Sequence, residues 1–348
     1  MSRGGTTAGQ LLKFLLGAAF FSWMVHSGKL DVRQVTNSLA RWRTLMAMAC
    51  LLYLQCAITA WRWNLLLRAQ EIRIPYRQAF GLAMIGLLFN LVIPGAVGGD
   101  VIKGYYITRA APGRKSEAAT SVLMDRILGV VGLFLLAALV STFNFRTLAH
   151  TTMTRHLVTF VIIGLVGGTL VVYSAVLAGA RLSEWQVLPR VLGSAFLSLS
   201  RYHEKSSVIP IAVAVTLLSH LFSCLAYFLA MHATGQAVDV TVADFFLLVP
   251  LGLLATAIPI SPAGIGVGQA AFFALFRVVS LAQATAAASA FTVYQLGTIL
   301  ISLSGFCWYL SYKHASVPDS ADLANARDVV RASRPGVYTW LRRGETDD

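Results

Sequence analysis

Long apolar segments with almost no charged residues recur along the chain and constrain its fold more than any other feature. A helix needs roughly 20 apolar residues to cross a bilayer, and each of these segments is close to that length. Only 12% of the residues are charged, whereas a soluble domain has about 25%. This composition excludes a soluble enzyme, a coiled coil and a disordered chain. We therefore expect an all-α polytopic membrane protein with about six full spans: Leu11–Ser27, Leu45–Trp63, Ala118–Thr142, Leu157–Ala178, Val208–Met231 and Ala284–Tyr312.

Two further apolar stretches, Ala79–Gly99 and Val242–Phe276, are interrupted near their middles by proline and glycine. Basic segments, Arg62–Arg77 and Lys103–Lys115, flank the first stretch, and positively charged loops tend to remain in the cytoplasm. The loop His232–Thr241, which precedes the second stretch, has no Lys or Arg and is expected outside. Each stretch must then return to the side on which it starts. The sequence predicts two oppositely oriented re-entrant hairpins.

The hairpins and their flanking spans are expected to form an inverted repeat, as in many secondary transporters. Its halves cover about 44–142 and 208–312. We assign residues 1–312 to one transmembrane domain and residues 313–348 to a cytoplasmic tail, either a short amphipathic helix or disordered. One segment conflicts with this topology, because Lys29–Arg43 is placed outside and yet carries four basic residues.

The two hairpin tips are candidate binding sites, because irregular backbone inside a membrane needs partners from protein or from a wet cavity. The first tip contains Pro94, Gly98 and Gly99, and its backbone N–H groups, with the cations that follow, suit a phosphate. The second tip supplies Ser261 and Gln269 as neutral polar contacts. The alternative is that the glycines only permit tight turns and close helix packing.

Charged residues near or inside the predicted spans are further candidates, since such charges usually face a cavity or a partner. Asp125 and Arg126 could form a structural ion pair with each other. Alternatively, Arg126 could meet a lipid phosphate while Asp125 pairs with Lys103. Asp100 is either a binding residue or the N-cap of the helix after the hairpin. His220 is interpreted as a hydrogen-bonded packing residue in preference to a proton relay.

Other sequence features receive structural interpretations. Trp61-Arg62-Trp63 ends a predicted span and is interpreted as part of the aromatic belt at the membrane interface. The histidines and cysteines show no spacing typical of a metal site, so we expect no metal and no cofactor. The net charge of +13 is attributed to cytoplasmic loops and their contacts with anionic lipid head groups, and not to nucleic acid binding.

Four motifs follow one another along the chain: Asn90-Leu-Val-Ile-Pro-Gly-Ala-Val-Gly-Gly-Asp100, Lys103 with Arg109, Ser121-Val-Leu-Met-Asp-Arg126, and Pro259-x-Ser-Pro-x-Gly-Ile-Gly-Val-Gly268. In this order and spacing, from Leu11 to about Tyr312, the chain resembles the lysylphosphatidylglycerol synthase transmembrane-region family of flippase-like membrane proteins. The Arg62-Trp63 pair is also in place. The resemblance implies a lipid-translocating domain, here without the synthase domain. Two departures are Gln269, where members often carry an acidic residue, and Lys103, where they often carry an arginine.

The hairpin tips, the charges and the matching motifs together define the candidate substrate-binding residues. They are Asn90, Pro94, Gly98, Gly99, Asp100, Lys103, Arg109, Asp125, Arg126, Pro259, Ser261, Pro262, Gly264, Gly266 and Gln269.

The leading functional hypothesis is a lipid translocase, a flippase or a scramblase, and not an enzyme. It would move an anionic phospholipid, a glycolipid or a polyprenyl-phosphate-linked lipid across the bacterial inner membrane, with both termini in the cytoplasm. The alternatives are a membrane enzyme acting on a lipid phosphate and a non-transporting accessory subunit of a lipid or glycan biosynthetic complex. The expected partners are the lipid itself and, as options, a second copy of the chain or a biosynthetic partner. Proton coupling through Asp100, Asp125 or His220 stays open.

Overall fold

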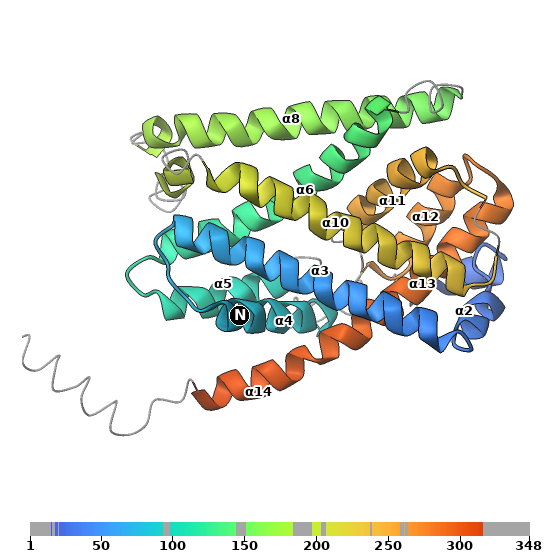
Figure 1. Ribbon diagram of the computed structural model, residues 1–348, viewed down its shortest axis with the longest axis horizontal. Helices are drawn as coiled ribbons and strands as arrows, with labels where there is room; N and C mark the ends of the chain where they lie inside the picture. The colour runs from blue at the N-terminus through green and yellow to red at the C-terminus, as the bar shows by residue number, and fades with distance from the viewer. Residues whose placement is uncertain are drawn as a thin grey trace, which may run out of the picture. The chain divides into compact units, whose positions relative to one another are not determined.

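The computed structural model describes residues 15, 18–19, 21–92, 98–143, 151–183, 197–202, 207–236, 239–257, 261 and 264–315. Within these residues the chain forms helices and no strands (Figure 1), which confirms the all-α prediction. Five helices of the described part are long and apolar enough to cross a membrane, and they coincide with five of the six predicted spans. Of the remaining prediction, Leu11–Ser27, residues 15, 18–19 and 21–26 are helical and Ser27 is in a turn, whereas residues 11–14, 16–17 and 20 lie outside the described residues.

The helices fall into two groups by length. The span-length helices are α3 (Trp42–Ala69), α6 (Lys115–Phe143), α8 (Thr152–Ser183), α10 (Val208–Ala233) and α13 (Leu281–Leu303), the last followed by α14 (Gly305–Ala315). The shorter helices are α2 (Val32–Ser38), α4 (Tyr76–Val92), α5 (Gly98–Ala110), α11 (Val242–Thr256) and α12 (Val267–Phe276). Asp31, Thr241 and Ser280 fix the starts of α2, α11 and α13, because each side chain accepts a backbone N–H from the first turn.

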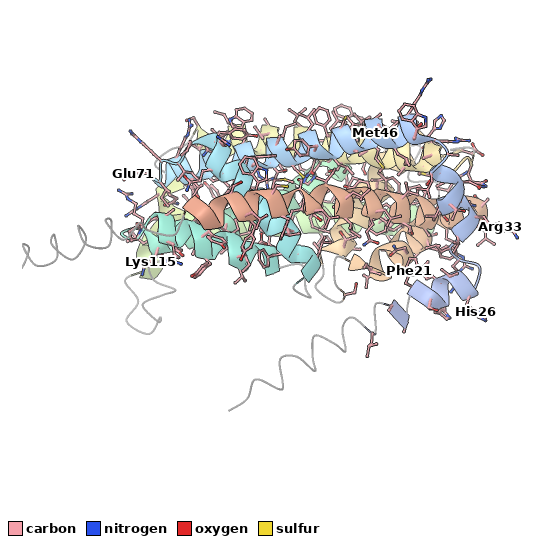
Figure 2. The ribbon with its side chains drawn as sticks, turned by 90° about the horizontal axis from the view of Figure 1, so that it is seen from below. Phe21, His26, Arg33, Met46, Glu71 and Lys115 are labelled. Carbon is pink, nitrogen blue, oxygen red and sulfur yellow. The ribbon has the colours of Figure 1, made fainter. Side chains whose placement is uncertain are left out.

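Helices α3 and α10 pack along each other in opposite directions (Figure 1). The hydroxyl of Tyr202, in the helical segment before α10, donates to the carbonyl oxygen of Leu66 near the end of α3 at 3.3 Å. At the opposite end, Arg41 donates to the carbonyl oxygen of His232 at 2.6 Å. We call the end where α3 finishes the first end and the end where α10 finishes the second end. Figure 2 shows Glu71 at the first end and Arg33 at the second.

Helices α4 and α5 have 17 and 13 residues, fewer than a membrane crossing needs, and they pack against each other. Arg114, which follows α5, donates to the carbonyl oxygen of Gln70 at 3.1 Å and forms an ion pair with Glu71 at 2.7 Å. Gln70 and Glu71 directly follow α3. The chain therefore begins α4 and finishes α5 at the first end, where Glu71 and Lys115 lie in Figure 2.

Helices α11 and α12 have 15 and 10 residues and are held by an aromatic stack. The ring of Tyr227, near the end of α10, stacks on Phe272 of α12 with centroids 4.5 Å apart. Phe245 at the start of α11 and Phe276 at the end of α12 lie 6.2 Å and 6.4 Å from Tyr227, centroid to centroid. Phe291 of α13 extends the stack at 4.8 Å from Phe272. The chain therefore begins α11 and finishes α12 at the second end.

The segment Lys29–Arg43, whose positive charge conflicts with the predicted topology, lies at the second end. Arg41 contacts His232 there, and the backbone N–H of Asp31 donates to Ser289 at 3.2 Å. The fold thus places this segment beside the start of the loop His232–Thr241. Both loops must face the same side of any membrane that the bundle spans.

The chain divides into two compact units, Met1–Phe306 and Cys307–Asp348. All contacts discussed below belong to the first unit. In the second unit, α14 is described as far as Ala315. The predicted tail, residues 313–348, lies almost entirely outside the described residues.

Candidate functional site

A buried cluster of charged side chains joins α3, α5 and α6. The carboxylate of Asp125 accepts from Arg62 Nε through Oδ1 and from Lys103 Nζ through Oδ2, both at 2.9 Å. The three side chains are 5%, 8% and 10% exposed for Arg62, Lys103 and Asp125. Of the pairings that the sequence left open, the structure therefore shows Asp125 with Lys103, and it adds Arg62.

Arg62 is the residue that the sequence interpretation placed wrongly. It does not lie in an interface belt, because its helix continues to Ala69 and its side chain is buried. Its two terminal nitrogens donate to the backbone oxygen of Asp125 and to the hydroxyl of Thr216 on α10, each at 2.9 Å. Trp63 is fully buried as well. Its indole N–H donates to Ser121, and Lys103 Nζ lies 3.9 Å from its ring centroid.

The cluster carries an unbalanced charge. Arg62 and Lys103 supply two positive charges and Asp125 one negative charge, so the formal sum is +1. Charges inside a membrane protein are costly unless they are paired or face water. An ammonium group has three donors, and Asp125 takes one of those of Lys103. The cluster is therefore a favourable neighbour for an anion.

Lys103 and Asp125 line a cavity of about 180 Å³ between α3, α4, α5 and α6. At the liquid volume of about 30 Å³ per water, this space holds about six waters. Its lining also contains three of the other predicted site residues, Asn90, Gly99 and Asp100. Sequence reasoning missed the wall that α3 contributes, which contains Gln55, Cys56 and Thr59. The sequence does indicate these three residues, because polar side chains are uncommon inside an apolar span.

A second ion pair joins α5 to α6 beside this cavity. Arg126 bonds to the carboxylate of Asp100, and both side chains are about two-thirds buried. Asp125 and Arg126 therefore have different partners and do not pair with each other. Asp100 lies in the first turn of α5, and the described contact of its side chain is with Arg126 and not with the helix N-terminus.

The glycines of α4 and α5 let the two backbones meet. A methyl group added at Gly99 would overlap the carbonyl oxygen of Gly86. Asn90 stabilises this contact between α4 and α5, because its Oδ1 accepts the backbone N–H of Gly99 at 2.7 Å. Gly98 is also buried. These residues set the position of Asp100 and Lys103, one and four positions further along α5.

The second predicted tip forms a separate, uncharged network. Gln269 is fully buried; its Oε1 accepts the backbone N–H of Gly266 at 2.7 Å and its Nε2 donates to Gln295 at 2.8 Å. Gly264 and Gly266 have φ of +73° and +82°, values that glycine adopts without strain. Ser261 Oγ is buried and has no hydrogen-bond partner among the described residues. None of these residues lines the cavity at Lys103.

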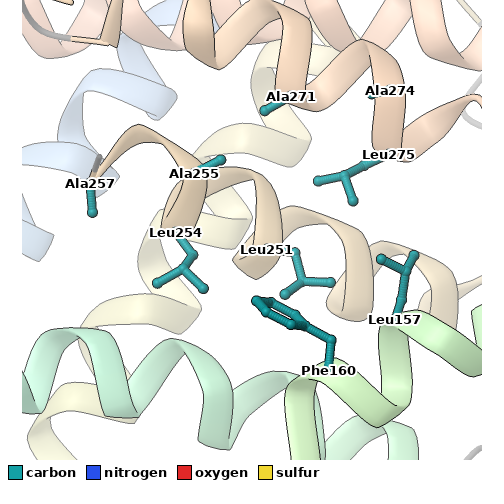
Figure 3. Close-up of a pocket in the computed structure, with 9 residues that line it drawn as sticks. All are labelled: Leu157, Phe160, Leu251, Leu254, Ala255, Ala257, Ala271, Ala274 and Leu275. Carbon is teal, nitrogen blue, oxygen red and sulfur yellow. The ribbon is translucent and has the colours of Figure 1, made fainter. Parts of the chain in front are cut away.

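Next to this network, an apolar groove of about 460 Å³ lies between α8, α11 and α12 (Figure 3). Phe160 and Leu157 of α8 face Leu251 and Leu254 of α11 across it, and Leu275 of α12 lines another wall. Among the described residues that line this groove, none has a charged or polar side chain.

Several predicted residues lie apart from the cavity. Arg109 is exposed near the end of α5, where it donates to the hydroxyl of Tyr105 at 3.0 Å. His220 makes a hydrogen bond of 2.9 Å with the carbonyl oxygen of Gly129, which agrees with its interpretation as a packing residue. Pro94, Pro259 and Pro262 fall outside the described residues. In the part of the chain that the structure describes, no three His, Cys, Asp or Glu side chains gather as metal ligands would.

Comparison with known proteins agrees with this membrane architecture. Residues 10–305 match the family described as "Lysylphosphatidylglycerol synthase TM region". The chain is also similar to a protein of Pyrococcus horikoshii named UPF0104 membrane protein PH1989, with 33% identity over 87 residues. That alignment covers 24% of this chain and 26% of the relative, so the chain matches about a quarter of the relative's length.

Proposed function

Because the chain belongs to the lysylphosphatidylglycerol synthase transmembrane-region family, we propose that it is a lipid translocase, a flippase or a scramblase. Its substrate would be an anionic phospholipid, a glycolipid or a polyprenyl-phosphate-linked lipid, moved across the cytoplasmic membrane. The observation that carries this proposal is the buried cluster of Arg62, Lys103 and Asp125, whose formal charge of +1 borders a polar cavity. A phosphate at Lys103 would neutralise this charge.

The cavity suits the head group of a lipid better than a whole lipid. Its volume of about 180 Å³ is below the roughly 300–1,000 Å³ of ordinary small-ligand pockets. Neutral polar groups of Gln55, Thr59 and Asn90 line it beside the charged ones and would receive hydroxyl groups of a glycerol or a sugar. The acyl chains would remain in the surrounding lipid while the head group passes.

A path across the membrane would run between two re-entrant hairpins. In this proposal α4–α5 enters from one face and α11–α12 from the other. The contacts that support it are those of Arg114 with Gln70 and Glu71 at the first end, and those of Phe245 and Phe276 with Tyr227 at the second end. The two halves would then form the inverted repeat of a transporter.

We place the first end and both chain termini in the cytoplasm. The reason is the positive-inside bias, since the short connections at this end and the helix ends beside them carry Arg68, Arg73, Arg77, Arg114 and Lys115. The second end would face the opposite side of the membrane. Arg41, one of its basic residues, is engaged by the carbonyl oxygen of His232.

Leaflet-resolved lipid movement in proteoliposomes tests the proposal. The fluorophore should be on the acyl chain, because a labelled head group exceeds the cavity. Anionic phosphatidylglycerol should exchange between leaflets faster than in empty vesicles, and Lys103→Met should bring the rate back to that of empty vesicles. Arg43→Gln, which removes an exposed cation far from the cavity, is the matched control and should keep the wild-type rate.

Two other outcomes would contradict the proposal in whole or in part. Folded wild-type protein that moves neither phosphatidylglycerol nor a polyprenyl phosphate would overturn the translocase proposal. Movement that is equally fast in wild type and Lys103→Met would remove the charged cluster from the path.

A further inference from the structure

A second space adjoins the ion pair of Asp100 and Arg126. It is a groove of about 400 Å³ between α6 and α8, and Arg126 is the charged residue among the side chains that line it. The other lining residues are apolar or glycine: Leu123, Ile127, Val130, Val131, Gly167, Gly168, Val171 and Val172. The groove is therefore apolar along its length, with one cation in its wall.

Two glycines of α8 create this space. A methyl group at Gly164 would overlap the ring of Phe134 on α6, so the helices are in close contact there. One turn further on, a methyl group at Gly167 would meet no atom within 4 Å, and one at Gly168 would meet only Val131, at 3.6 Å. The absent side chains leave room for an elongated apolar guest.

Arg126 connects the groove to the polar cavity. Its guanidinium bonds to Asp100, and Asp100 lines the cavity that also contains Lys103. About a third of the Arg126 side chain is exposed, and this side chain lines the groove. A polar compartment and an apolar one thus meet at a single ion pair, an arrangement that matches the two parts of a charged lipid.

Two other apolar grooves in the described part of the chain lack this combination. The nine residues that line the groove in Figure 3 are all apolar. The groove of about 580 Å³ on the α10 side of α6 is larger, and the described residues that line it carry no charge. The α6–α8 groove differs from those two because a cationic side chain, Arg126, is part of its lining.

We propose that the groove between α6 and α8 seats one acyl chain of an anionic phospholipid whose phosphate contacts Arg126. This inference extends the proposed function, because it states where the tail lies while the head group is at the cavity. Occupancy of the groove does not itself require movement of lipid, so the two proposals can be tested separately.

Photo-crosslinking with two matched lipids tests whether this groove is the binding site, or seat, of the acyl chain. Phosphatidylglycerol and phosphatidylcholine, each with a diazirine midway along one acyl chain, are added to the purified protein in phosphatidylcholine vesicles. Labelled peptides are mapped by mass spectrometry. The phosphatidylglycerol probe should label residues 127–131 and 167–172 about threefold more than the phosphatidylcholine probe, the factor expected for a partly exposed ion pair.

Two variants separate charge from shape. Arg126→Gln should remove the preference between the probes. Gly167→Leu adds a side chain to the groove at a position where a Cβ meets no atom within 4 Å. It should remove the excess labelling by the phosphatidylglycerol probe there, even if Arg126→Gln folds poorly. Ala274→Leu places the same side chain in the groove of Figure 3 and should leave labelling of α6 and α8 unchanged.

The results distinguish this inference from the proposed function. Equal labelling by both probes in wild type, or a preference for the phosphatidylglycerol probe that persists in Gly167→Leu, would overturn the seat even if lipid exchange is observed. Selective labelling that is lost in both variants would support the seat even if proteoliposomes showed no exchange. In that case the translocase proposal would fail and a lipid-binding membrane protein would remain.

Discussion

Asp125→Asn is the substitution whose effect on stability follows most directly from the structure. The carboxylate holds Arg62 and Lys103 at 2.9 Å each, and its side chain is 10% exposed. The amide removes the negative charge and leaves two buried cations, so the formal charge of the cluster rises from +1 to +2. Removing one partner of a buried ion pair costs about 3–5 kcal/mol. We expect the free energy of unfolding to fall by that amount.

Lys103→Met supplies the contrasting change. It lowers the cluster charge to zero and leaves Asp125 paired with Arg62, so it should cost less than Asp125→Asn. In the double variant only Arg62 remains charged, and the coupling of residues in contact is about 0.5–3 kcal/mol. The Asp125→Asn/Lys103→Met protein should therefore be at least as stable as the Asp125→Asn protein.

Steric trapping in lipid bicelles measures the free energies of unfolding. Arg43→Gln is the control and should change the value by no more than about 0.5 kcal/mol, as exposed substitutions do. The reasoning would be refuted by an Asp125→Asn loss below about 1 kcal/mol. It would also be refuted by a double variant that loses the full sum of the two single effects.

Three further substitutions give signed expectations in the same unfolding assay. Gly99→Ala drives a methyl group into a carbonyl of α4 and should lower the free energy of unfolding by about 1–3 kcal/mol. At Gly104 the methyl group meets open space, so Gly104→Ala should raise it by about 0.5–1 kcal/mol. The same sign for both substitutions would contradict this packing. In Arg62→Lys the ammonium group keeps the charge but cannot reproduce the three hydrogen bonds of the planar guanidinium. The free energy of unfolding should fall by about 2 kcal/mol. Wild-type stability would show that the planar geometry of the guanidinium is unimportant. Gln269→Leu leaves the buried N–H of Gly266 without its acceptor and should cost about 1–3 kcal/mol; a neutral result would mean that water or another group replaces it.

Hydropathy and length were sufficient to locate five of the six predicted spans. The predicted span Leu45–Trp63 corresponds to α3, and Val208–Met231 corresponds to α10 within two residues. Both depend on local composition, which the sequence displays directly. The end of α3 was predicted six residues too early, at Trp63 and not at Ala69, because Arg62 and Arg68 resemble the start of a loop.

The site was predictable only in part, because its pairings join distant segments. Lys103 and Asp125 were recognised as candidates, since both are charges close to or inside apolar helices. Arg62 was missed because two tryptophans flank it, a pattern typical of an interface, and only the fold brings Asp125 and Thr216 to it. Gln295 was missed for a similar reason, since a neutral residue within a long span gives no signal until its partner Gln269 is placed.

The contacts of Arg62 also determine the order of events during synthesis. Asp125 follows Arg62 by 63 residues and Thr216 by 154, so at about 5–20 residues per second these partners are made roughly 3–13 s and 8–31 s later. Until then we expect the guanidinium, seven residues before the end of α3, to stay close to the membrane surface or in the insertion machinery, since even at the centre of a span an arginine costs about 2.5–3.5 kcal/mol by insertion scales. Full insertion of α3 is therefore expected to wait for α6, and the last bond of the cluster closes only when α10 arrives.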